Sequence, residues 1–124
     1  MRFQSYINEG KYDFELFYNK AKKKYGNPIP LGKFIGNCKA HDCDKNSFKH
    51  RKEYDLYKGE LVPKERNFYD GSMINHIFNV DKETGKVVEF TSIEPNLNEK
   101  EWKDKYFYFG KKLPNNIKLK DICK

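Results

Sequence analysis

Residues 74–91 restrict the fold most, because apolar and polar side chains alternate along two arms that flank a short polar stretch. Alternation with a period of two is typical of β-strands with one buried face. Residues 81–85 have the composition of a turn, so the segment predicts a β-hairpin. In such a hairpin His76 and Phe78 share one face. We expect Glu89, on the returning arm, to lie beside His76 on that face.

A thiol delivered to the His76 face would complete a set of groups suited to nucleophilic catalysis. Cys38 is the candidate, because the glycine-containing residues 30–36 predict a constrained loop that leads to it. The segment 38–51 is then predicted to be helical. A thiol in the first turn of a helix has a lowered pKa and reacts more readily as the thiolate. Asn37, or the backbone amides next to it, is the candidate oxyanion donor.

The sequence resembles the small transglutaminase-like (papain-like) cysteine proteins found in phages and bacteria. The resemblance begins at Cys38 and continues in the Tyr-Lys-Gly-Glu-Leu segment at 57–61. It then covers His-Ile-Phe-Asn-Val at 76–80 and Gly-Lys-Val-Val-Glu-Phe-Thr at 85–91. Together these motifs span the middle half of the chain. They imply a papain-like or transglutaminase-like core.

The resemblance implies acyl transfer or amide hydrolysis through a Cys-His-Glu triad. Cys38 would be the nucleophile, His76 the acid and base, Glu89 the group that orients the imidazole, and Asn37 an oxyanion donor. The substrate would be a protein or peptide, with no metal and no cofactor. Two positions depart from the family pattern, which has Trp where Phe78 stands and Asp at the position of Glu89.

The whole chain, residues 1–124, is predicted to be a single α+β domain. In this fold an N-terminal helix and the Cys-bearing segment pack on a small antiparallel sheet. The aromatic run at 106–109 indicates a buried central strand. Residues 1–10 are expected to form an N-terminal arm, and they resemble the N-terminal peptides of internal head proteins of tailed phages. The other expected elements are a helix over 12–25, a strand over 54–62 and a helical turn capped by Asn98.

Composition narrows the class of protein. A charged fraction of 35% suits a disordered chain, but ten Phe and nine Tyr provide enough apolar surface for a core. The N-terminal residues lack the apolar run of a signal peptide, and three cysteines without one indicate a reducing compartment. We therefore expect a cytoplasmic protein that does not bind membranes. If the protein is viral, the expected location is the host cytoplasm or the interior of the virion.

Three other interpretations stay open. The net charge of +7 favours acidic partners, so the protein would bind nucleic acid through its basic, aromatic surface. A non-catalytic phage-type protein that inhibits a host protein would need no motif. The third is a zinc site, for which the spacing differs from that of common zinc fingers. Its ligands would be Cys38, His41 and Cys43, with His50 or Cys123 as the fourth.

Overall fold

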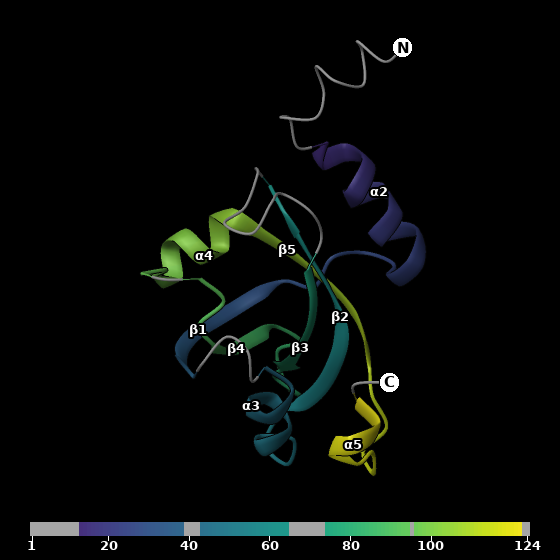
Figure 1. The fold of residues 1–124 in the computed structure, drawn as a ribbon, viewed down its shortest axis with the longest axis vertical. Coiled ribbons are helices and arrows are strands. Elements are labelled where there is room, and N and C mark those ends of the chain that lie inside the picture. Colours follow the sequence, from purple (N-terminus) through teal and green to yellow (C-terminus); the bar gives the residue numbers. More distant parts are fainter. Residues whose placement is uncertain (1–12, 39–42, 65–73, 95, 123–124) are drawn as a thin grey trace.

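The computed structural model describes residues 13–38, 43–64, 74–94 and 96–122 (Figure 1). These residues form a mixed α+β structure, which confirms the predicted fold class at that level. The strands are β1 (Leu31–Cys38), β2 (Asp55–Pro63), β3 (Ile74–Val80), β4 (Val87–Thr91) and β5 (Tyr106–Lys112). The helices are α2 (Phe14–Tyr25), α3 (Cys43–Lys49), α4 (Glu99–Lys105) and α5 (Leu119–Ile122). The predicted N-terminal arm, residues 1–10, lies outside the described residues.

The described strands form one sheet in the order β1-β4-β3-β2-β5. The four strands from β4 to β5 are antiparallel to one another, as the sequence predicted. The fifth strand was missed. Residues 30–36 were predicted to be a constrained loop, but residues 31–38 form β1, which pairs with β4 in parallel. Glycines at 32 and 36 and register shifts along β1 obscure its strand pattern.

The segment before β1 connects the two ends of the sheet. Ile29 forms a β-bridge with Tyr108 of β5, and its N–H donates to the Tyr108 carbonyl at 2.8 Å. The next residue, Pro30, accepts from the Val87 N–H of β4 at 2.9 Å. The sheet therefore curves until β4 and β5 approach the same segment. This arrangement corrects the prediction of a central strand at 106–109, because β5 is terminal in the strand order and is covered by this bridge.

The β3–β4 hairpin forms as predicted. Asn79 pairs with Val88 and Val80 with Val87. Asp81 closes the turn, since its carboxylate accepts from the Glu83 N–H at 2.8 Å and its carbonyl from the Gly85 N–H at 2.9 Å. A positive φ of 71° explains the glycine at 85.

The two faces of the sheet have separate cores. We call the face that packs on Trp102 the α4 face; its buried cluster is Leu61, Phe78, Val80, Val87, Ile93, Trp102, Tyr106 and Tyr108. The opposite α2 face is covered by α2, α3 and α5. Its buried residues are Ala21, Val62 and Phe109 beneath α2, and Leu56, Ile77 and Ile122 near α3 and α5. The alternation of Leu61 and Val62 along β2 sends neighbouring side chains into different cores.

Helices α2 and α4 both begin at a capping side chain. Asp13 accepts from the Leu16 N–H at 3.1 Å, and Asn98 accepts from the Glu101 N–H at 2.8 Å. The Glu101 side chain accepts from the Asn98 N–H in return, which completes a capping box. The cap therefore fixes where α4 starts and so where Trp102 enters the core.

Candidate functional site

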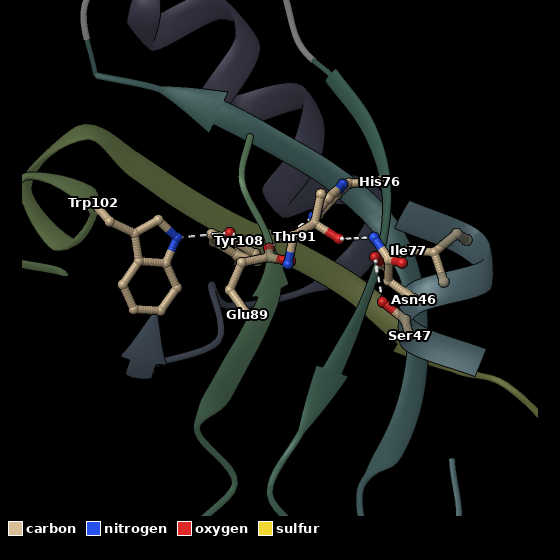
Figure 2. A network of polar contacts seen from close by, with 8 residues as sticks. All are labelled: Asn46, Ser47, His76, Ile77, Glu89, Thr91, Trp102 and Tyr108. Atoms are coloured by element: carbon tan, nitrogen blue, oxygen red, sulfur yellow. Dashed lines mark hydrogen bonds and ion pairs between the residues drawn. The ribbon is translucent and has the colours of Figure 1, made fainter. Parts of the chain in front are cut away.

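The contact between His76 and Glu89 is the centre of the candidate site. His76 on β3 and Glu89 on β4 are only 4% and 0% exposed, and His76 Nε2 lies 2.7 Å from Glu89 Oε1 (Figure 2). The hairpin register accounts for the contact, because it places both side chains on the α4 face. The Phe78 ring stacks beside the imidazole, with ring centroids 6.0 Å apart. A buried carboxylate thus holds a buried imidazole in one orientation.

Both oxygens of Glu89 accept hydrogen bonds. The Tyr108 hydroxyl donates to Oε1 at 2.5 Å, and the Thr91 N–H donates to Oε2 at 3.1 Å. A carboxylate in an apolar core needs such donors, because burial of an unpaired charge is costly. The Glu89 carboxylate therefore has hydrogen-bond partners on β5, on its own strand β4 and at His76.

Trp102 extends the network into α4. Its indole N–H donates to the Tyr108 hydroxyl at 2.7 Å, so Tyr108 links the helix to Glu89. Burial, together with the charge of Glu89 and the hydrogen bond to it, raises the pKa of Tyr108 well above its ordinary value. Tyr108 therefore remains a neutral hydrogen-bond donor across the physiological pH range.

Helix α3 is joined to the same region by hydrogen bonds. Asn46 donates through Nδ2 to the Thr91 hydroxyl at 3.2 Å, and the Ser47 hydroxyl donates to the Ile77 carbonyl at 3.0 Å (Figure 2). Asn79 Nδ2 donates to the Ser47 carbonyl at 3.0 Å. These bonds position α3 against the β3–β4 hairpin. Its N-terminal half is thereby held near Thr91, two residues after Glu89.

Cys38 differs from its predicted local structure. The residue was expected at the start of a helix, but it is the last residue of β1, and its backbone pairs with Thr91 of β4. The N-terminus of α3 therefore does not act on Cys38 as predicted. Cys38 and Thr91 nevertheless lie on neighbouring strands and face each other in the pairing of β1 with β4. Its side chain lies outside what the structure describes.

The start of the helix falls at Cys43 instead. Helix α3 covers Cys43–Lys49, which is shorter than the predicted span of 38–51. Cys43 precedes Asn46 by about one helical turn, and Asn46 is the residue bonded to Thr91. The backbone of Cys38 therefore pairs with the end of β4, and the helix that begins at Cys43 is bonded to the same residue through Asn46. The Cys43 side chain is likewise outside the described part of the structure.

Asn37, the predicted oxyanion donor, is the second-last residue of β1 and its side chain is exposed. The structure describes only some of the predicted zinc ligands. His41 and Cys123 lie outside the described residues, and His50 stacks on Phe90 with ring centroids 3.7 Å apart. Among the side chains that the structure describes, no group of three metal-binding residues comes together.

Sequence reasoning found His76 and Glu89 but missed the groups that surround them. Tyr108 was predicted only as part of a buried strand, and neither Trp102 nor Asn46 was predicted to belong to the site. The signal for the first two was available, because a buried Tyr or Trp normally finds a hydrogen-bond partner for its polar atom. The identity of that partner depends on sheet curvature, which a sequence pattern does not give.

The described fold and this network define a small α+β protein with a buried His-Glu-Tyr-Trp hydrogen-bond chain. Comparison with protein-family models, curated proteins and solved structures found no match. In the parts of the chain that are described, every helix is too short or too polar to cross a lipid bilayer.

Proposed function

We propose that this protein is a cysteine hydrolase or acyltransferase of the transglutaminase-like (papain-like) kind. The observation that carries the proposal is the 2.7 Å contact between His76 Nε2 and Glu89 Oε1 in the protein interior. An imidazole oriented by a carboxylate is the acid-base element that a thiol nucleophile requires. The packing of α3 on the β3–β4 hairpin supports a papain-like core, since it brings cysteine-bearing backbone to the strand that carries Glu89.

The hydrogen bonds of Glu89 favour one tautomer of His76. Glu89 Oε1 already accepts from Tyr108, and Oε2 accepts from Thr91, so the carboxylate acts as an acceptor at both oxygens. The neutral imidazole then carries its hydrogen on Nε2 and donates it to Glu89. Nδ1 is the nitrogen that would take the proton from the thiol.

The reaction follows from this assignment. The thiol proton moves to Nδ1 of His76, and the thiolate attacks the carbonyl carbon of an amide in a protein or peptide substrate. The tetrahedral intermediate collapses as the imidazolium gives the proton to the departing amine, which leaves a thioester. Water then releases a carboxylic acid, or a second amine forms a new amide. No cofactor takes part in this scheme.

Two cysteines are candidates for the nucleophile. Cys38 pairs through its backbone with Thr91, whereas Cys43 is the residue at which α3 begins. Cys38 is the nucleophile that the sequence predicts, and Cys43 is included because it lies about one helical turn before Asn46, which bonds to Thr91. Asn37 remains the proposed side-chain donor to the oxyanion.

The test measures the alkylation rate of each cysteine by iodoacetamide between about pH 5 and pH 9, with peptide mass spectrometry as the readout. We expect Cys38 or Cys43 to react as a low-pKa thiolate, and we expect His76→Gln to remove that reactivity. His50→Gln is the matched control, because His50 stacks on Phe90 of the α2 face. Acylation of the same cysteine by p-nitrophenyl acetate would show the thioester.

Reaction of all three cysteines with the pKa of about 8.5 of a free thiol would overturn the proposal. The protein would then be better explained by the alternative predicted from its charge, a non-catalytic protein that binds a host protein or nucleic acid. Retention of the protein on immobilised oligonucleotides, lost as salt is raised, would favour nucleic acid. Retention of a host protein on the immobilised chain would favour the inhibitor.

A further inference from the structure

We propose that Tyr108, held in place by Trp102, is a positioning residue that sets how strongly Glu89 holds the imidazole of His76. The proposal rests on the function proposed above. Tyr108 touches neither the thiol nor the substrate in that scheme, so it would act only through Glu89.

The direction of each hydrogen bond in this chain is fixed. An indole N–H only donates, so Trp102 makes the Tyr108 oxygen an acceptor. The single hydroxyl hydrogen of Tyr108 therefore points to Glu89 Oε1. His76 Nε2 bonds to this same oxygen. Tyr108 and His76 thus share one carboxylate oxygen, and a stronger bond from one weakens the other.

Packing holds the Tyr108 ring as firmly as its hydroxyl. Its ring lies edge-on to Phe78, with centroids 5.0 Å apart, and to Trp102, with centroids 5.7 Å apart. Its side chain is fully buried on the α4 face. A hydroxyl on a fixed ring can set the position of a carboxylate, because neither group has to be ordered again when the imidazole gains a proton.

The neighbouring ionisable groups on the α4 face have other partners. Tyr57 of β2 packs on Phe78, and the Tyr106 hydroxyl of β5 donates to Glu94. Tyr106 therefore provides a matched control for Tyr108. Both tyrosines are buried on the same face of the same strand, and both donate to a carboxylate. Only Tyr108 donates to the carboxylate that contacts His76.

The test is an NMR titration of the imidazole nitrogens in uniformly labelled protein, with the His76 signals identified from the spectrum of His76→Gln. Loss of the Tyr108 hydroxyl leaves more negative charge on Glu89 for the imidazolium, so its proton is held more tightly. We expect Tyr108→Phe to raise the titration midpoint of His76 by on the order of one pH unit. Trp102→Phe should move it in the same direction by less, because it weakens the Tyr108 hydroxyl only as a donor. Tyr106→Phe should leave it unchanged.

Equal midpoints in Tyr108→Phe and Tyr106→Phe would overturn the proposal, and so would a lower midpoint in Tyr108→Phe. If Tyr108→Phe does not fold, Trp102→Phe provides the comparison with Tyr106→Phe, with the same criteria. The titration needs no reactive thiol, so it separates this proposal from the proposed function. A raised midpoint without an activated cysteine would retain the role of Tyr108 and remove the enzyme. An activated cysteine with an unchanged midpoint would retain the proposed enzyme and remove the role of Tyr108.

Discussion

The core around Glu89 on the α4 face and the core beneath α2 on the opposite face are both tightly buried, but they are held by different chemistry. On the α4 face a chain of hydrogen bonds connects Trp102, Tyr108, Glu89 and His76. Beneath α2, Ala21, Val62 and Phe109 pack with aromatic rings such as that of Tyr18. An apolar contact accepts several side chains of similar volume, whereas a buried polar network requires the right donor or acceptor at each place. These two cores should therefore respond differently to substitution.

The largest difference is expected from removal of the carboxylate. Glu89→Ala leaves the Tyr108 hydroxyl, His76 and the Thr91 N–H without their acceptor inside the core. We expect the free energy of unfolding to fall by about 3–5 kcal/mol, as when one partner of a buried ionic contact is lost. Urea denaturation at neutral pH measures it. A loss below about 1 kcal/mol would mean that water or rearrangement satisfies these donors.

A second pair of variants compares chemistry with shape. Glu89→Gln keeps the shape of the side chain but turns one acceptor into a donor that faces other donors, which should cost about 1–3 kcal/mol. Phe109→Leu changes the shape beneath α2 but stays apolar, and it should cost less than about 1.5 kcal/mol. The same urea experiment compares them. The reverse order would show that packing, not hydrogen bonding, dominates on both faces.

The faces should also differ at alkaline pH. The pKa of Tyr108 is raised in the folded protein, so the unfolded chain loses this proton first, from about pH 10 upward. The contribution of Tyr108 to the free energy of unfolding is therefore fully present below that pH. Above it this contribution is lost, by up to about 1.4 kcal/mol per pH unit. Tyr108→Phe should remove this part of the slope, as followed by Trp102 fluorescence.

Tyr25 of α2 is the natural control for that titration. Partial burial also raises its pKa, while the neighbouring Lys24 opposes the change. Because this group is less buried, Tyr25→Phe should change the alkaline slope less than Tyr108→Phe does. Equal slopes would indicate that both tyrosines experience a similar environment.

The smallest effects are expected at the helix caps. Asn98→Ala and Asp13→Ala each remove one capping acceptor and should cost about 1 kcal/mol. Of these two helices, α4 carries Trp102 of the polar network and α2 carries no residue of it, so Asn98→Ala alone of the two variants should also alter Trp102 fluorescence and the His76 NMR signals. A change in those signals from Asp13→Ala would mean that the two faces are coupled through the sheet.

Much of the fold could be predicted because local patterns determine it. Alternation predicted the hairpin and the contact of His76 with Glu89, and the amphipathic spacing of apolar residues predicted α2. β1 was missed because its glycines interrupt the alternation. The run at 106–109 suggested a central strand because both of its faces are covered, although β5 is terminal in the strand order. The pattern of apolar residues in a strand indicates how buried the strand is, but not its position in the strand order.

The rest of the candidate site depends on contacts that are distant in sequence. Tyr108 reaches Glu89 only because the sheet curves, and β2 and β3 lie between their strands in the strand order. Helix α3 begins at Cys43 rather than at Cys38, since residues up to Cys38 are used by β1. No periodicity in the sequence reports either fact. The assignment of Cys38 failed on its local structure for that reason.

The parallel pairing of β1 with β4 also affects synthesis of the chain. A ribosome releases Leu31–Cys38 long before Val87–Thr91, the only strand in the described sheet that pairs with it. Until then β1 has no neighbour, and an unpaired strand can associate with other nascent chains. Chains stalled before Val87 should therefore be cut by protease within β1, whereas completed chains should resist. Strand β1 therefore gains its place in the sheet only after the β3–β4 hairpin has been synthesised.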